Sequence, residues 1–142
     1  MSKFLARPDE SPASRCRIRV SSSDSAEKKF IVRTYTDHNP GSFYQYTIKE
    51  NKLVKLSDVN PSLVVNDMAE MKPISFMTRD SLLVNGYLTL PKGRTKKNLP
   101  VVVMPHGGPD SRSSWGYNSE VQFLANRGYA VFQVNFRGSK GY

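Results

Sequence analysis

VVVMPHGGPDSR, residues 101–112, is the stretch that decides the fold, because an apolar run ends there at a proline, a histidine and two glycines. Val101 to Met104 are apolar without alternation, which predicts a strand buried on both faces, as in a parallel sheet covered by helices. Adjacent glycines after such a strand predict a sharp turn whose backbone N–H groups face an open crevice, where open α/β sheets bind ligands. The stretch therefore predicts an α/β sheet with a candidate site at its carboxyl edge.

A helix and a second strand are predicted after this stretch. Ser119 and Gln122 fit a capping box, and Arg127 followed by Gly128 fits the C-terminus of a helix. Residues 129–136 return to a β pattern. Strand, helix and strand in quick succession predict two parallel strands joined by a right-handed crossover.

A β-hairpin is predicted before this stretch. Residues 74–78 and 82–90 alternate between apolar and polar positions on either side of a turn at residues 79–81. Ser81 occupies a turn position that favours glycine, so we expect slight backbone strain there. This second organisation begins near Pro73.

The N-terminal half has a different period. Short alternating strands are predicted around residues 30–35, 44–48 and 53–56, with a further one at 16–20. A meander of this kind is typical of one propeller blade or of a small antiparallel sheet. Residues 60–72 lack a strand period and are interpreted as a linker with at most a short helix.

Composition excludes several classes of function. The net charge of +9 comes from 21 basic and 12 acidic residues, but the basic residues are scattered, so no nucleic-acid partner is expected. The single Cys16 excludes a disulfide within the chain. Without a clustered His/Cys set or a phosphate-binding loop, no metal or cofactor is predicted. Neither a signal peptide in residues 1–15 nor an apolar run of membrane length is present, which favours a soluble, cytoplasmic protein with no membrane partner.

Three stretches together resemble the prolyl oligopeptidase family of serine peptidases, especially its dipeptidyl aminopeptidase and acylaminoacyl peptidase branches. They read FIVRTYTDHNPGSFYQY, MAEMKPISFMTRDSLLVNGYLTLPKG and NLPVVVMPHGGPDSRSSWGYNSEVQFLANRGYAVFQVNFRGSKGY. Asp110 and Ser113 stand where relatives often carry an aromatic residue and a later aspartate, and Ser81 replaces a common glycine.

The resemblance implies an α/β fold with an N-terminal antiparallel β part. Residues 1–66 would be the terminal blade of a β-propeller, 67–72 a linker, and 73–142 the N-terminal part of an α/β-hydrolase domain, built as a β-hairpin and a parallel βαβ unit. The family pattern gives the backbone N–H of Gly108 the role of oxyanion donor. Gly107 would allow close approach, and His106 would shape the loop. A bulky residue at Gly108 is expected to act through distortion.

The residues that would use this oxyanion loop are not found in the chain. Serine acyl transfer needs a nucleophile, a base and an acid, and on this fold the serine sits in a G-x-S-x-G turn that the sequence lacks. His38 is interpreted as a surface residue, and neither His38 nor His106 is expected to lie where it could activate Ser139. Arg137 is expected to be structural or to pair with a carboxylate.

The leading hypothesis is therefore a fragment of a serine peptidase, truncated before its nucleophile and inactive alone. Its parent would cleave peptide substrates through an acyl-enzyme. An esterase- or lipase-type fragment and a non-catalytic interaction remnant remain as alternatives. The strand after Pro100 is expected to leave an unpaired edge, through which the chain could self-associate.

Overall fold

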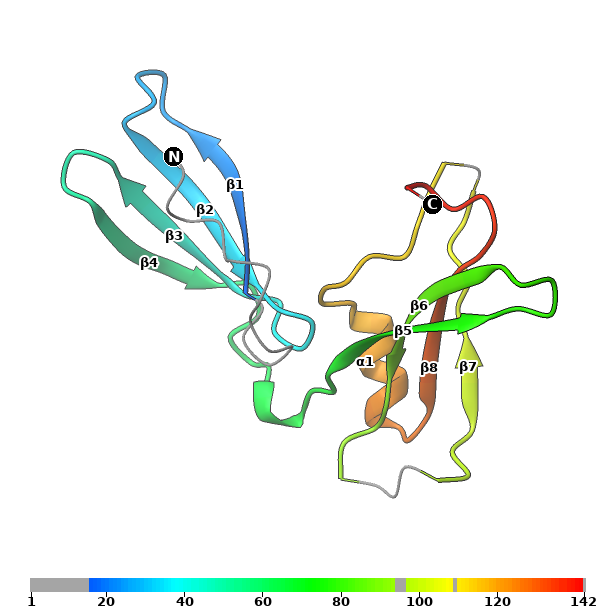
Figure 1. Cartoon of the computed structure of the whole chain (residues 1–142). Coiled ribbons are helices and arrows are strands. Elements are labelled where there is room, and N and C mark those ends of the chain that lie inside the picture. The colour runs from blue at the N-terminus through cyan, green and yellow to red at the C-terminus, as the bar shows by residue number, and fades with distance from the viewer. Residues whose placement is uncertain (1–15, 94–96, 109, 142) are drawn as a thin grey trace. The chain divides into compact units, whose positions relative to one another are not determined.

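The computed structural model describes residues 16–93, 97–108 and 110–141, and the chain divides into two compact units, Met1–Leu63 and Val64–Tyr142 (Figure 1). Residues 1–15 and Pro109, to which the sequence expectations extend, lie outside the described residues. Among the helices that the structure describes, none has the length and apolar character needed to cross a membrane.

The first unit is a four-stranded antiparallel sheet in which every strand pairs with its neighbour in sequence. The strands are β1 (Arg17–Ser23), β2 (Lys29–Tyr35), β3 (Ser42–Thr47) and β4 (Lys52–Asp58). Their register is shifted once in each outer pair, between Val20 and Ser22 and between Phe43 and Tyr44. Irregularities of this kind are common at sheet edges, where they discourage pairing with other chains. The predicted antiparallel meander is confirmed.

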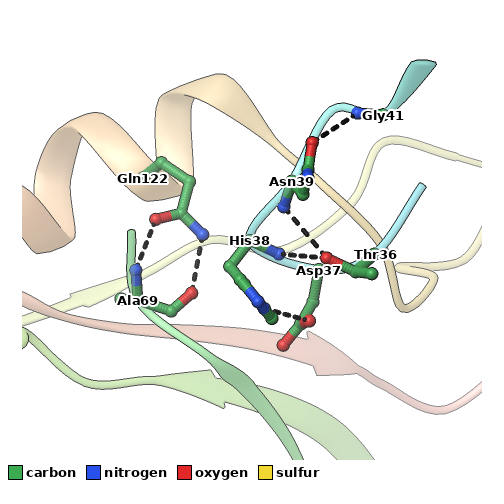
Figure 2. Close-up of polar contacts among 7 residues, drawn as sticks. All are labelled: Thr36, Asp37, His38, Asn39, Gly41, Ala69 and Gln122. Atoms are coloured by element: carbon green, nitrogen blue, oxygen red, sulfur yellow. Dashed lines mark hydrogen bonds and ion pairs between the residues drawn. The ribbon is translucent and has the colours of Figure 1, made fainter. Parts of the chain in front are cut away.

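The turn between β2 and β3 is held by its own polar side chains (Figure 2). Thr36 Oγ1 accepts hydrogen bonds from the N–H groups of His38 and Asn39 at 3.3 and 3.0 Å, and Asn39 Oδ1 accepts one from Gly41 N–H at 2.8 Å. His38 Nδ1 lies 2.8 Å from Asp37 Oδ1. The interpretation of His38 as a surface residue is wrong, since its side chain is 29% exposed and paired with a buried carboxylate.

The second unit contains a mixed four-stranded sheet and one α-helix. It begins with a short 3₁₀ helix, η2 (Val65–Asp67), and continues through the sheet strands and the helix in the order β5 (Met71–Met77), β6 (Leu83–Thr89), β7 (Val101–Val103), α1 (Ser119–Asn126) and β8 (Ala130–Asn135). The strand order is β5-β6-β8-β7, with β7 and β8 parallel and the other pairs antiparallel (Figure 1). The predicted hairpin and parallel β7–α1–β8 unit are confirmed.

Three local expectations need correction. Strand β5 begins at Met71, inside the predicted linker, because residues 71 and 72 already pair with the end of β6. The helix cap is Asn118, whose Oδ1 accepts hydrogen bonds from the N–H groups of Glu120 and Val121, so Ser119 is the first helical residue and no capping box forms. Val101 is 59% exposed, because β7 is an edge strand with β8 as its single described neighbour.

Ser81 has a φ of +61°, so the expected strain in the β5–β6 turn is confirmed. The turn is closed by two hydrogen bonds, since the N–H of Thr78 donates to Leu82 O at 2.9 Å and the N–H of Ser81 donates to Thr78 O at 3.0 Å. A serine adopts this left-handed conformation at a cost that glycine does not incur.

The core of the second unit lies where α1 covers the sheet. Val131 of β8 and Val121 of α1 are 0% and 1% exposed. Gln122 is also buried, and its side-chain amide binds both main-chain groups of Ala69: Oε1 accepts from the N–H at 2.8 Å, and Nε2 donates to the oxygen at 2.7 Å (Figure 2). One side chain thus satisfies two buried backbone groups and ties the segment before β5 to the helix.

Candidate functional site

The candidate site is the loop that follows β7 and reaches α1, residues 104–118. Met104 N–H still donates to Phe132 O of β8 at 2.8 Å, and beyond Met104 the chain leaves the sheet. The parallel pairing of β7 with β8 therefore places this loop at the same edge as the residues after β8, 136–141 (Figure 1). Two loops that are 30 residues apart in sequence meet there.

Gly107 and Gly108 are exposed, and their conformation differs from the expectation. Neither glycine has a φ in the left-handed range, and a Cβ on either one would meet no heavy atom within 4 Å. The glycines are therefore not required by a sharp turn, and the expected distortion by a side chain at Gly108 is not supported at the Cβ position. Their small size instead leaves the surrounding backbone uncovered.

The N–H groups of these two glycines point to no acceptor within the described part of the chain. Exposed N–H groups without protein partners can bind an anionic oxygen, provided that the backbone around them is held still. The loop therefore has the chemistry of an oxyanion-binding segment.

His106 lies in contact with Ser139, contrary to the expectation. Its Nε2 is 2.6 Å from Ser139 Oγ, its Nδ1 is 2.7 Å from Gly107 O, and its ring stacks on Phe136 with centroids 4.3 Å apart. Ser139 Oγ donates its proton to Phe136 O at 2.7 Å, and Ser139 is 2% exposed. Because a hydroxyl has one proton and this one is buried, the pair holds the loops together and lacks the exposed serine that a nucleophile needs.

Asn135, the last residue of β8, binds the same loop farther along. Its Oδ1 accepts from Ser113 N–H at 2.7 Å, and its Nδ2 donates to Ser113 O at 3.1 Å. Lys140 N–H donates to Ser111 O at 2.9 Å. Sequence reasoning missed Asn135, although an amide side chain that ends an apolar strand is a signal for a buried polar partner.

Arg137 pairs with Asp80 of the β5–β6 turn, as expected for a carboxylate partner. The hydrogen bond from Thr78 Oγ1, 2.5 Å long, is the largest cause that lowers the pKa of Asp80, and the Arg137 guanidinium lowers it further. Both members of the ion pair are more than half exposed, so water screens their attraction.

The other sequence candidates do not gather into a catalytic set. Ser113 is buried and its main chain is bound by Asn135, while Ser114 is exposed. His38 belongs to the first unit and pairs with Asp37. Within the described ranges, no three His, Cys, Asp or Glu side chains are grouped as metal ligands would be.

A hollow of about 540 Å³ lies at the opposite end of the parallel strands from the glycines. Pro100 and Tyr129, which precede β7 and β8, line it together with two basic side chains. Those basic side chains are Lys97 and Arg127. The largest side-chain network around the glycines is therefore separate from this hollow, and the chemistry of the loop is not that of an enclosed pocket.

Comparisons with known proteins agree on one family. The chain is 36% identical over 132 residues to dipeptidyl aminopeptidase BIII of Pseudoxanthomonas mexicana, covering 88% of this chain and 19% of that protein. It superposes on the acylaminoacyl peptidase of Pyrococcus horikoshii with a TM-score of 0.64 and 27% identity, covering 87% of this chain and 20% of that one. A solved acylaminoacyl peptidase in complex with Z-Gly-Gly-Phe-chloromethyl ketone gives a TM-score of 0.63 at 27% identity, over 87% and 19% of the two chains.

No family model matches the chain. The chain spans about a fifth of the length of the curated relative and of the solved structures it matches. Sequence and structural similarity both extend over most of its residues, across both units, and both lead to peptidases with one shared ancestry. The chain therefore belongs to the prolyl oligopeptidase family of serine peptidases.

Proposed function

We propose that these residues form part of a serine peptidase that hydrolyses peptide bonds through an acyl-enzyme, and that the Gly108 N–H is one of its oxyanion donors. The observation that carries the proposal is the exposed glycine pair, with N–H groups that no described residue accepts from, at the carboxyl end of a parallel strand. Gly107 keeps the approach to this N–H open, and His106 holds the start of the loop.

The proposed chemistry is transition-state stabilisation. When a serine Oγ attacks the substrate carbonyl carbon, the C=O π bond opens and the oxygen gains a negative charge, while a base takes the serine proton. A backbone N–H aimed at that oxygen contributes about 2.7–4 kcal/mol, judged from the loss when a comparable donor is removed. A pre-positioned donor acts without reorganisation at the moment of reaction.

The nucleophile, the base and the acid are proposed to come from parts of the peptidase outside these 142 residues. The chain has no G-x-S-x-G, and both of its histidines are engaged, His106 with Ser139 and His38 with Asp37. By this proposal the 142 residues alone neither cleave peptides nor react with a serine-directed probe.

The family architecture is proposed for the two units. The antiparallel sheet within residues 1–66 is interpreted as the terminal blade of a β-propeller, residues 67–72 as a linker, and residues 73–142 as the first part of an α/β-hydrolase domain. Support comes from the change from sequential antiparallel pairing to a parallel β7–α1–β8 unit. Because β5 begins at Met71, its first two residues belong structurally with the second part.

A peptide is the proposed substrate. The aligned relatives are named for aminopeptidase and acylaminoacyl peptidase activities, and one aligned structure holds a peptide-like chloromethyl ketone. These names favour a peptidase over an esterase or a lipase, with which the oxyanion loop is shared.

The test of this proposal compares two substitutions at Gly108 in the complete peptidase that contains these residues. Gly108→Pro removes the N–H, and we expect kcat to fall about 10²–10³-fold with a small change in KM. Gly108→Ala is the matched control, because it keeps the N–H and its Cβ meets no heavy atom within 4 Å. Equal kcat values for both variants would remove Gly108 from the mechanism.

The same experiment has an arm on the 142-residue chain itself. We expect no labelling by a fluorophosphonate probe and no cleavage of aminoacyl or acylaminoacyl peptides. Stoichiometric labelling of one serine, abolished by His106→Ala, would instead reveal a catalytic pair within the chain.

A further inference from the structure

We propose that the loop after β8, residues 135–141, is the device that positions the Gly107–Gly108 backbone, with Asn135 and Ser139 as its positioning residues. The inference rests on the proposed role of Gly108 as an oxyanion donor. The geometry points to it because each end of the glycine segment is fastened to this loop, while the glycines themselves contact nothing.

The first attachment is at His106, next to the glycines. Its ring is held on one face by Phe136, with an angle of 15° between the planes, and at its Nε2 edge by Ser139. Because Ser139 Oγ donates to Phe136 O, the ring contact has Nε2–H donating to Oγ. Both partners of the ring therefore belong to the loop after β8.

The second attachment follows the glycines, at Ser111 and Ser113. Asn135 pairs with both main-chain groups of Ser113 as a neighbouring strand would, and Lys140 N–H binds Ser111 O at 2.9 Å. Asn135 and Ser113 are 3% and 7% exposed, so these bonds are shielded from competition with water. The chain between His106 and Ser111 is thus tied at both ends.

Fixing both ends of a short segment removes most of its conformational freedom, which an oxyanion donor requires. A misplacement of about 1 Å in a catalytic group can reduce the rate on the order of 10²-fold. The two attachments supply this rigidity from buried residues without covering the exposed glycines. Their effect on catalysis is therefore indirect, through the direction of the Gly107 and Gly108 N–H bonds.

The chain offers a matched control for this proposal. Gln122 binds both main-chain groups of Ala69 with a buried side-chain amide, which is the same chemistry that Asn135 applies to Ser113. Loss of either amide leaves one N–H and one C=O without that partner in a buried place. The two substitutions therefore perturb the second unit similarly, but Asn135 alone of the two contacts the glycine loop.

The experiment is ¹⁵N relaxation on the 142-residue chain and its Asn135→Ala, Ser139→Ala and Gln122→Ala variants. We expect the order parameters of the Gly107 and Gly108 amides to fall from about 0.85, typical of rigid backbone, to below about 0.6 in Asn135→Ala. Ser139→Ala should lower them by a smaller amount and change the ¹⁵N shifts of the His106 ring. Gln122→Ala should leave both glycine amides unchanged.

Two outcomes would overturn the proposal: glycine order parameters that stay rigid in both Asn135→Ala and Ser139→Ala, or an equal loss in Gln122→Ala. Ser139→Ala keeps the proposal testable if Asn135→Ala does not fold, because it removes one hydroxyl and keeps the Phe136 ring. The readout is independent of peptidase activity. A failure here is therefore distinguishable from a failure of the Gly108 assignment, which the kinetics of Gly108→Pro would report.

Discussion

The two sheets of this protein have the same number of strands but different ways of burying residues. In the first unit, every residue of the outer strands β1 and β4 is exposed, and the described residues include no buried aliphatic or aromatic side chain. In the second unit, α1 covers the sheet, and Val121 and Val131 are almost fully buried. A sheet satisfies its backbone by itself, but it buries side chains only when a second layer packs on it.

This difference explains how each unit is held together. The first unit depends on its hydrogen-bond ladders and on polar turns such as that at residues 36–41. The second unit adds a hydrophobic core and two buried side-chain amides, from Gln122 and Asn135. Hydrophobic burial is the dominant favourable term in folding, so we expect the second unit to be the more stable of the two.

The largest expected effect tests whether the core is confined to the second unit. Trp115→Ala removes a buried indole, and we expect the second unit to lose about 3–5 kcal/mol of unfolding free energy. Ile18→Ala in the first unit removes a side chain that is 51% exposed, and we expect a change within about 0.5 kcal/mol. Urea dependence of amide hydrogen exchange, compared between β8 and β2, measures each unit separately. Similar losses from the two substitutions would contradict the comparison.

The next effect compares glycines, one in each unit. Gly41 has a φ of +95°, and a Cβ there would lie 1.5 Å from Thr34 O. Gly41→Ala should cost the first unit about 2–5 kcal/mol, because left-handed backbone strain and overpacking add. Gly86 has no left-handed φ, and its Cβ would lie 2.6 Å from Gln133 O, so Gly86→Ala should cost the second unit about 1–3 kcal/mol. Chemical denaturation of both variants gives the order, and a larger loss from Gly86→Ala would reverse it.

The smallest effect is a dependence of the first unit on acid. The pKa of Asp58 lies below its ordinary 3.8, first because Lys55 Nζ donates to it at 2.7 Å and next because Ser42 Oγ donates at 2.6 Å. A folded pKa that is lowered stabilises the folded state above pH 3.8, and this stabilisation is lost as the pH falls through the folded pKa. Both charged side chains are exposed, so the effect is small.

Asp58→Asn should flatten the acid dependence of β3–β4 amide exchange below pH 3.8 and leave that of the second unit unchanged. Asp80→Asn is the reciprocal control, because the pKa of Asp80 is also lowered, chiefly by Thr78, and this residue belongs to the second unit. An Asp58→Asn variant with the original acid profile in β3–β4 would show that this carboxylate does not contribute.

Much of the fold could be predicted from local sequence. Alternation between residues 29 and 56 predicted the antiparallel strands, and the order of strand, helix and strand after Pro100 predicted the parallel pairing. These features follow from side-chain periodicity and chain connectivity, which are properties of neighbouring residues. The family was recognisable for the same reason, since its motifs are short and contiguous.

The partners of individual side chains could not be predicted in this way. Nothing near His106 in sequence indicates Ser139, which is 33 residues away, and nothing near Ser113 indicates Asn135, 22 residues away. The exposure of Val101 was also missed, because burial depends on which strands flank an edge and not on the apolar character of the strand itself.

By itself the sequence determined the order of the elements, the glycine pair at the end of β7 and the peptidase family to which they belong. Only the tertiary structure decided that the glycines are exposed, with backbone held at both ends by the loop after β8. The physical reason is that periodicity acts between residues a few positions apart, whereas the parallel pairing of β7 and β8 brings together loops that are 30 residues apart and lets buried polar side chains select their partners there.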